Sequence, residues 1–365
     1  MRNALFRGLL VCLCVLPLGV WAGLNDTGQA LCYYGRPMEA CRDRDLAYPG
    51  QDGQHGRDAQ ASKGRLHKQG GGAAGFDFVP LDIHGKTIGL DEKGSPVEAH
   101  ACVRDAVTGL VWRVGMPQEE ALGPEEARAM VDLARREAWC GFSDWRLPHL
   151  RELLSLGHFD RLGIGIDPTF FPDVRKEWYR SADLLPGRPD LVKVFSYEGK
   201  SNNGLKSFAM SQDRAFWLRL VRGEPSKARF KAKPGGTVLD ESTGLVWDAC
   251  VFGQRGKRCE KGRPLHMDWT EALRLVQKLN ARRYKGFSDW RLPNAKEFYS
   301  IVDEARIRPA IDPTFFPKAE KDWYWTSTTR VYFTGGVHTT DFVEGYTRFD
   351  NKWESYYLRL VRGGL

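Results

Sequence analysis

The octapeptide GFSDWRLP occupies residues 141–148 and returns letter for letter at residues 286–293. Three further words recur around it in the same order: TGLVW at 108–112 and 243–247, IDPTFFP at 166–172 and 311–317, and LRLVRG at 218–223 and 358–363. Solenoid repeats are only roughly 20–50 residues long, so this longer period indicates two globular domains. Residues that both copies keep are expected to build the fold, and residues private to one copy are expected to carry local function.

Both copies show the same order of predicted elements. The first copy spans 101–223, the second spans 237–365, and a basic linker, 224–236, joins them. In each copy TGLVW reads as a turn and strand, two helices follow, and alternating stretches then read as antiparallel strands. The first helix opens with Pro124 and acidic residues, which suit a first helical turn. This order predicts an α+β fold with two helices packed on antiparallel sheet, the first and last strands being neighbours.

The residues before the first copy indicate an exported chain. Residues 1–22 read as a signal peptide, because basic residues precede an apolar run from Leu9 to Val20 and Ala22 suits cleavage. The run is short for a membrane span, and no later stretch is apolar enough to cross a bilayer. Residues 23–100 form a Gly-rich leader with a small disulfide loop. Within it, 69–75 reads as a flexible linker and 76–82 as a short strand.

Composition leaves several classes of partner open. A hydrophobic content of 42% supports a core in each domain. The net charge of +8 suits contact with acidic glycans, anionic envelope surfaces or nucleic acid. No nucleic-acid motif accompanies the charge, so nucleic acid is not expected as a partner. We expect a periplasmic, extracellular or cell-surface protein that meets a glycan or another envelope or extracellular protein.

Six cysteines remain once the signal peptide is removed, and an even number in an exported chain predicts disulfides. Two of them are missing together from the second copy, and two others lie in an insertion private to that copy. A zinc site is disfavoured, because no CxxC pair occurs and no His lies at ligand spacing, so no metal is expected. The predicted pairs, the last by elimination, are Cys102–Cys140, Cys250–Cys259 and Cys32–Cys41.

The recurring words resemble a known family. TGLVW, GFSDWRLP with a Glu four residues later, WYWTST at 323–328 and the closing LRLVRG are similar to the C-terminal domain of the Legionella collagen-like adhesin, a bacterial exported domain of largely unknown function. The leader words DTGQ at 26–29 and GQDG at 50–53 are also similar to segments that precede this domain. The resemblance implies a C-type-lectin-like fold and binding of sulfated glycosaminoglycans. This chain lacks a collagen-like Gly-X-Y tract and carries two domains in tandem, so display as a collagen-stalked trimer is not implied.

The residues shared by both copies are predicted to be structural. An Arg fork suits a carboxylate or sulfate ligand. Repetition within one chain instead favours a buried Trp beside an Asp–Arg pair at the strand-to-helix corner, with the following Glu as a helix cap. The structural residues on this reading are Trp145, Arg146 and Glu152 in the first copy and Trp290, Arg291 and Glu297 in the second.

The residues private to the second copy are the better candidates for ligand binding. Basic residues gather in its insertion and before its GFSDWRLP word, and aromatic residues that could stack on sugar rings gather near its end. A run of charge is usually a solvated surface, and each contact to a sulfate is modest and salt-sensitive. The candidate ligand-binding residues are Lys257, Arg258, Arg282, Arg283, Lys285, Tyr346 and Trp353.

Calcium is the one cofactor that a lectin-like fold would suggest. The nearest acidic and amide candidates lie in the last loops of the second copy: Asp341, Glu344, Asp350 and Asn351. Neither copy contains an EPN-like or QPD-like tripeptide, and the first copy has Met210 and Ser211 opposite the last two candidates. A solvated loop is therefore favoured over a calcium-dependent sugar site, and no cofactor is expected.

The sequence favours a non-enzymatic binding protein of adhesion type. No histidine recurs at the same place in both copies, and no GxSxG, P-loop, HExxH or GxGxxG word occurs in the right context. The first alternative is an envelope module that holds protein partners without binding sugar. The second is an oxidase-like enzyme, because lectin-like folds include oxidases with a reactive cysteine pair. Cys102 and Cys140 do not stand in such a motif.

Overall fold

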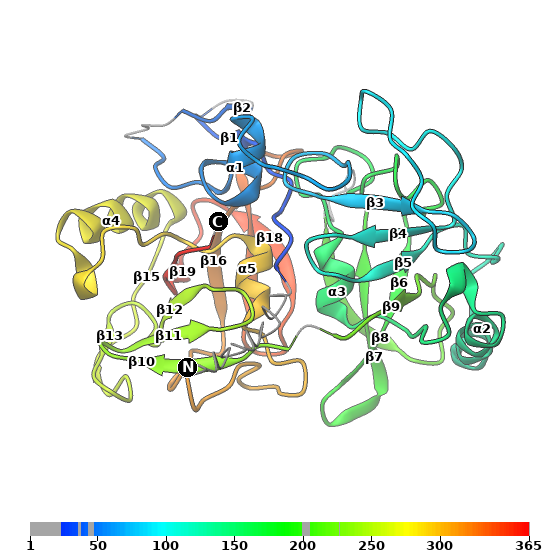
Figure 1. The fold of residues 1–365 in the computed structure, drawn as a ribbon. Helices are drawn as coiled ribbons and strands as arrows, with labels where there is room; N and C mark the ends of the chain where they lie inside the picture. Colours follow the sequence, from blue (N-terminus) through cyan, green and yellow to red (C-terminus); the bar gives the residue numbers. More distant parts are fainter. Residues whose placement is uncertain (1–22, 36–37, 43–46, 199–204, 226, 365) are drawn as a thin grey trace, which may run out of the picture.

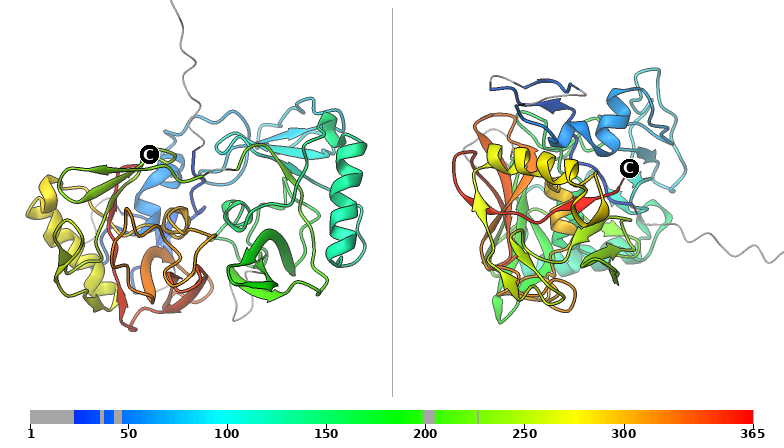
Figure 2. Two further views of the ribbon diagram at one scale, coloured as in Figure 1. Left: turned by 90° about the horizontal axis from the view of Figure 1, so that it is seen from below. Right: turned by 90° about the vertical axis from the view of Figure 1, so that its left-hand side faces the viewer.

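The computed structural model describes residues 23–35, 38–42, 47–198, 205–225 and 227–364. The predicted signal peptide lies outside these residues. The two copies form two lobes side by side, and most of the leader lies against the second lobe (Figure 1). The structure is α+β, with antiparallel sheets and five α-helices among the described residues. The two further views of the ribbon show the same two lobes, with the leader along one side of them (Figure 2).

A four-stranded sheet opens and closes each repeat. In the first repeat the order is β3-β4-β5-β9, and in the second it is β10-β11-β12-β20. The TGLVW strand pairs with the closing strand in both, through Trp112 opposite Val221 and Trp247 opposite Val361. The predicted neighbourhood of first and last strands is therefore present. The strands are β3 Phe78–Leu81, β4 Cys102–Asp105, β5 Val111–Arg113, β9 Val221–Arg222, β10 Phe230–Lys233, β11 Thr237–Asp240, β12 Val246–Asp248 and β20 Val361–Arg362.

A second, longer sheet completes each repeat. Its order is β6-β7-β8 in the first repeat and β15-β19-β16-β17-β18 in the second, where β19 runs parallel to β16. A separate hairpin, β13-β14, is private to the second repeat. The strands are β6 Trp178–Leu185, β7 Arg188–Ser196, β8 Lys206–Ser211, β13 Gln254–Arg255, β14 Lys261–Gly262, β15 His266–Met267, β16 Trp323–Thr329, β17 Gly336–Asp341, β18 Thr347–Asn351 and β19 Tyr356–Tyr357.

The helices lie where the apolar periodicity predicts them. The longer pair, α2 (Pro124–Arg136) and α4 (Trp269–Ala281), buries one face, with Ala127, Val131 and Ala134 inward in α2. The shorter pair, α3 (Leu150–Ser155) and α5 (Ala295–Ser300), follows the GFSDWRLP words and is almost wholly buried. Between long and short helix, each repeat makes a tight turn, at Trp139–Gly141 and Tyr284–Gly286.

Two segments expected to be linkers are built into the sheets. In the Gly-rich stretch 69–75, Gly71 and Phe78 exchange backbone hydrogen bonds of 2.8 and 2.9 Å. The Asp77 carboxylate also accepts the backbone N–H of Gly70, so this stretch is a packed loop and not a flexible linker. The basic segment 224–236 contains β10, which pairs along its whole length with β11. The first sheet of each repeat therefore begins upstream of the first recurring word.

The two repeats meet at a seam where equivalent residues contact each other, as at a two-fold interface. Ser207 in β8 and Thr347 in β18 are equivalent by strand register. In the first repeat Tyr179 pairs with Phe195, which pairs with Ser207. In the second repeat Tyr324 pairs with Thr340, which pairs with Thr347. The backbone N–H of Thr347 donates to Ser207 Oγ at 3.1 Å. Contact between like positions is what a closed two-fold interface requires. The tandem copies are thus arranged as an internal dimer.

The second residues of α3 and α5 repeat this reciprocity. The guanidinium of Arg151 crosses to the second repeat, donates to the Val302 carbonyl at 2.7 Å and pairs with Glu304 at 2.9 Å. The ammonium of Lys296 crosses the other way and donates to the Ser155 carbonyl at 2.7 Å. Each cation therefore binds groups at or just beyond the end of the opposite short helix.

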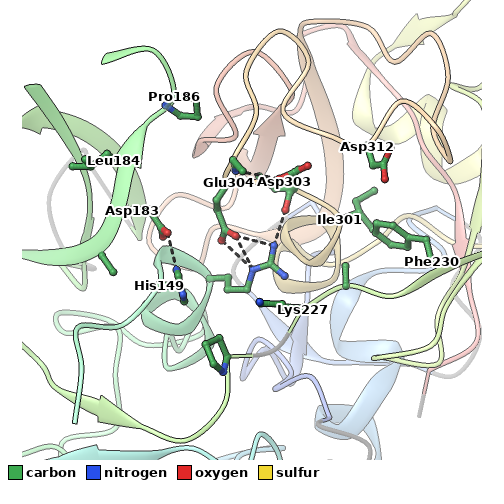
Figure 3. A pocket seen from close by; sticks show the side chains of 16 residues that line it. His149, Asp183, Leu184, Pro186, Lys227, Phe230, Ile301, Asp303, Glu304 and Asp312 are labelled. Atoms are coloured by element: carbon green, nitrogen blue, oxygen red, sulfur yellow. Dashed lines mark hydrogen bonds and ion pairs between the residues drawn. The ribbon is translucent and has the colours of Figure 1, made fainter. Parts of the chain in front are cut away.

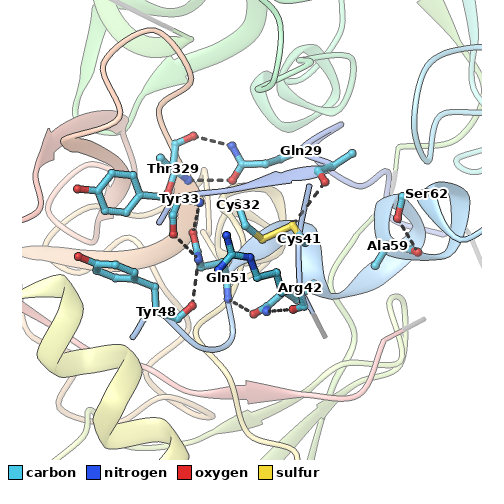
Figure 4. The surroundings of a disulfide bond; sticks show 12 residues. Gln29, Cys32, Tyr33, Cys41, Arg42, Tyr48, Gln51, Ala59, Ser62 and Thr329 are labelled. Atoms are coloured by element: carbon cyan, nitrogen blue, oxygen red, sulfur yellow. Dashed lines mark hydrogen bonds between the residues drawn. A yellow bond between two sulfur atoms is a disulfide. The ribbon is translucent and has the colours of Figure 1, made fainter. Parts of the chain in front are cut away.

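The leader packs onto the second repeat through a small disulfide loop. Strands β1 (Leu31–Cys32) and β2 (Glu39–Ala40) form a two-residue ladder closed by the disulfide Cys32–Cys41, and α1 (Gly56–Ser62) follows. Gln29 exchanges two hydrogen bonds with the backbone of Thr329 in β16, at 2.6 and 2.9 Å (Figure 4). The Tyr48 ring stacks on Trp269 of α4. This loop fastens the leader to the second repeat.

Residues 24–30 run through the seam itself and reach a buried charged junction (Figure 1). Asp26, Asp52 and Asp58 are buried there, and the Thr27 hydroxyl bridges the last two, 2.7 Å from Asp52 and 3.4 Å from Asp58. Burial raises the pKa of all three carboxyls. Burial also lowers the pKa of Lys296, which donates to the Asp26 carbonyl, to about 7. Leader and both repeats therefore share one polar core.

Candidate functional site

The residues that both copies share build the strand-to-helix corner. Arg146 makes two hydrogen bonds of 2.7 Å to the carboxylate of Glu152, and Arg291 makes the same pair to Glu297 at 2.5 and 2.6 Å. Each Glu also accepts the backbone N–H at the helix start, which completes a capping box. Such bidentate pairs leave neither Arg free to bind a ligand.

The expected Asp–Arg pair within the corner is replaced by a longer-range one. Asp144 binds Arg222 of the closing LRLVRG word at 2.9 Å, and Asp289 binds Arg362 at 2.8 Å. The partner of the Arg in GFSDWRLP is the helix-capping Glu, because that carboxylate lies beside it in the buried corner. Trp145 and Trp290 are both buried, and each indole N–H donates to a backbone carbonyl. The shared words are thus structural.

A cleft of about 600 Å³ opens where the two repeats and their connecting segment meet (Figure 3). His149 and Asp183 line it from the first repeat, and the ion pair of Arg151 with Glu304 crosses it. Apolar surface comes chiefly from Leu184, Pro186, Pro225 and Phe230, and further charge comes from Lys227, Asp303 and Asp312. The cleft therefore combines a hydrophobic wall with charges of both signs.

His149 lines this cleft beside a mostly buried carboxylate. Its Nδ1 lies 2.7 Å from Asp183 Oδ1, and its side chain is 37% exposed. The hydrogen bond that His149 donates to Asp183 raises the pKa of His149. Burial alone would raise the pKa of Asp183, but hydrogen bonds from His149 and the Leu150 N–H lower it instead. Among the described residues that line the cleft, none is a Ser, Thr or Cys.

The structure divides the predicted ligand-binding residues into two groups. Lys257, Arg258, Arg282 and Arg283 are exposed. Lys285 is instead half-buried, and its ammonium donates to Asp248 and to the Gly236 carbonyl, both at 2.8 Å. Lys285 is therefore a structural cation.

The two aromatic candidates differ in the same way. The Tyr346 ring stacks on Phe208 of the first repeat, with ring centroids 5.7 Å apart, so it is part of the seam. Trp353 is 67% exposed and remains available to a ligand. The Cys250–Cys259 disulfide, formed as predicted, closes the loop that carries Lys257 and Arg258, and β13-β14 form its base.

The acidic residues weighed for calcium are committed to the protein itself. The carboxylate of Asp341 accepts backbone N–H groups from Val343, Glu344 and Tyr346, which makes it the organiser of its loop. Asp350 accepts from Thr339 and Arg348. Within the described ranges, no group of three or more His, Cys, Asp or Glu side chains is arranged to hold a metal ion. Asp341 and Asp350 are therefore already bound to protein groups.

Two features of the structure were not predicted from the sequence. The His149–Asp183 dyad had a usable signal, because His149 is private to the first copy and directly follows a shared word. The buried junction around Lys296 had none, since its carboxylates come from a leader with no recurring word. Both depend on packing between segments far apart in the chain.

Three disulfides, Cys32–Cys41, Cys102–Cys140 and Cys250–Cys259, are formed and indicate an oxidising, extracytoplasmic compartment. In the described part of the chain, none of the helices has the length and apolar character that crossing a bilayer requires.

Comparison with known proteins defines the family. No curated protein matches the chain. The model of the Lcl C-terminal domain matches twice, at residues 101–222 and 236–362. The chain therefore belongs to the Lcl C-terminal domain family and carries two of these domains in tandem.

Proposed function

We propose that this protein is an exported, non-enzymatic binding protein of adhesion type that recognises acidic or sulfated glycans through the second repeat. The observation that carries the proposal is a set of uncompensated cations. Lys257, Arg258, Arg282 and Arg283 are exposed, and none of them forms an ion pair with any described residue. Lys285, the fifth predicted cation, shows the contrast because Asp248 neutralises it. Free cations on a disulfide-closed loop and at a helix end are suited to sulfate and carboxylate groups.

Two further features support this proposal. Trp353 presents an exposed indole on the same repeat, and indoles stack on sugar rings. The neighbouring first and last strands of each repeat bring its ends together, which agrees with the C-type-lectin-like fold that we propose for both repeats. Members of that fold class bind sugars through their loops, although fold alone is a weak argument for function.

The test is heparin binding by the protein without its signal peptide. Heparin affinity should fall steeply with salt, because several ionic contacts are released together. Reversal of all four exposed cations, K257E/R258E/R282E/R283E, should reduce affinity by at least about a hundredfold, since each lost contact contributes roughly 1 kcal/mol. Circular dichroism and the thermal midpoint check that the variant is folded.

A glycan array with and without calcium completes the test. Binding to acidic glycans in the presence of a chelator supports the proposal and agrees with the absence of a suitable calcium site among the described residues. Retention by an envelope protein with no binding to any glycan would favour the alternative, a protein-interaction module, and would sink the glycan proposal.

A further inference from the structure

A continuous groove separates the leader from helix α4 of the second repeat. Two cavities of about 660 and 480 Å³ meet at this boundary, and the larger one is lined by the leader apart from Gln277 of α4. Gly50, His55 and Gln277 line both of them, so the cavities join end to end. The leader forms one wall with α1 and the turn before it. The other wall is α4 with the turn that follows it, which leads to GFSDWRLP.

The groove is polar and offers several amide and hydroxyl groups. Gln60 lines the leader wall, and Gln277 and Ser288 line the α4 wall, whereas the Asn280 amide is already bound to the backbone of Trp290. Gln277 is exposed and makes no hydrogen bond through its side chain to a described residue. Amide side chains can donate to and accept from the hydroxyl groups of a sugar at the same time. Such a lining suits a carbohydrate better than it suits an apolar ligand.

Three cations lie on the exposed side of α4, outside the set of residues that line the two cavities. Arg274, Lys278 and Arg282 are spaced four residues apart, which places them on one side of the helix. All three are exposed, and none forms an ion pair with a described residue. On the leader wall, Arg65 is also exposed. The acid on the groove, Asp289, is neutralised by Arg362.

Comparison of the repeats shows that this surface is private to the second one. In α2, the equivalents of Arg274, Lys278 and Arg282 are Ala129, Leu133 and Glu137, and the equivalent of Gln277 is Asp132. The disulfide loop and α1 of the leader lie over the second repeat, where the cations are (Figure 1). Cations and leader therefore occur together on one repeat, although the two helices share their fold.

We propose that this groove binds an extended chain of anionic polysaccharide, with amides facing its hydroxyl groups and the α4 cations facing its sulfate or carboxylate groups. The inference rests on the proposed function and deepens it by placing the ligand between leader and α4. The leader then forms half of the binding site and is more than a spacer.

The test compares two variants with the same change in charge. R274E/K278E reverses two cations beside the groove, and R128E/R136E reverses two exposed cations on the equivalent helix of the first repeat. With heparin as the probe at physiological salt, the groove variant should bind about tenfold or more weakly, while the control should stay within about twofold of the wild type. Equal losses in both variants would mean that net charge alone matters and would overturn the groove.

A third variant blocks the groove without changing its charge. Gln277→Trp places a bulky ring between α4 and the leader. Because Gln277 is exposed to solvent, the substitution should leave the protein folded. Heparin affinity should fall about tenfold with an unchanged dependence on salt, because no ionic contact is removed. If K257E/R258E/R282E/R283E abolishes binding while Q277W and R274E/K278E behave as wild type, the groove is wrong and the proposed function stands. If wild-type protein binds neither heparin nor another acidic glycan, both are wrong.

Discussion

The turn that precedes GFSDWRLP has the same backbone in both repeats but is held by different chemistry. Cys140 and Lys285 occupy equivalent positions with nearly identical left-handed angles, φ 51° and ψ 30° against φ 51° and ψ 25°. In the first repeat the turn is tied to β4 by the disulfide Cys102–Cys140. In the second, the ammonium of Lys285 ties it to Asp248 and to the Gly236 carbonyl next to β11.

The neighbouring residues change together with this clamp, by which we mean the group, Cys140 or Lys285, that fastens the turn to the first sheet. Arg113 stacks over the Trp139 ring in the first repeat, and its equivalent, Asp248, accepts a hydrogen bond from Tyr284 at 3.0 Å in the second. Four equivalent positions thus differ together between the repeats. The pairs are Cys102 and Thr237, Arg113 and Asp248, Trp139 and Tyr284, and Cys140 and Lys285. The comparison teaches that the fold requires this turn to be fastened to the first sheet, while the kind of fastening is free to vary.

The largest expected effect comes from the corner that the repeats share without change. Glu297→Ala should lower the free energy of unfolding by about 3–5 kcal/mol, because it leaves the buried Arg291 guanidinium without its partner. Glu152→Ala should cost only about 2 kcal/mol, because the Arg146 side chain is 20% exposed and keeps its bonds to the Gly223 carbonyl. Urea unfolding of both variants measures the difference. Equal losses would show that the two corners are equally buried in solution.

The clamp itself can be transplanted to sharpen the comparison. Thr237→Cys, Asp248→Arg, Tyr284→Trp and Lys285→Cys together give the second repeat the set found in the first. We expect a gain of about 2 kcal/mol in stability under oxidising conditions, from the smaller unfolded ensemble of the closed loop. The gain should disappear when a reductant is added, which thermal melts with and without dithiothreitol would show. K285C alone should destabilise, because Asp248 is buried and loses its partner.

The sequence predicted those parts of the molecule that depend on local pattern or on comparison of the copies. Pro124 marked the start of α2, and the joint absence of two cysteines from the second copy identified the Cys102–Cys140 pair. It missed the seam, since Lys296 gives no sign in the sequence that its ammonium reaches the other repeat. It also assigned Lys285 to a ligand, because a cation in an ion pair and a free cation look alike until Asp248 is placed beside it.

The smallest expected effect concerns the N-cap residues of the short helices, His149 before α3 and Asn294 before α5. Asp183 raises the pKa of His149, so the pair adds stability that is full below the unfolded-state pKa of His and is lost as pH rises through the folded-state value. The pKa of Asp183 is lowered, so the same pair weakens again as pH falls through that value. His149→Asn should therefore reduce stability near pH 5 more than at pH 8.

The size of this pH effect should stay below about 1 kcal/mol, because His149 is partly exposed to solvent. Thermal midpoints of both proteins at the two pH values give the result. A loss that is the same at both values would mean that His149 acts only as a helix cap, as Asn294 does in the second repeat.

The two-fold seam has a consequence for a protein of an extracytoplasmic compartment. A dimer of separate chains falls apart when it is diluted, since its assembly depends on concentration. Here the partners share one chain through 224–236, so each sees the other at an effective concentration on the order of millimolar, however dilute the surroundings are. The contact between Ser207 and Thr347 therefore persists however few molecules are present. The covalent link also gives the halves separate sequences, which allowed one of them to gain cations while the other kept none at the same positions.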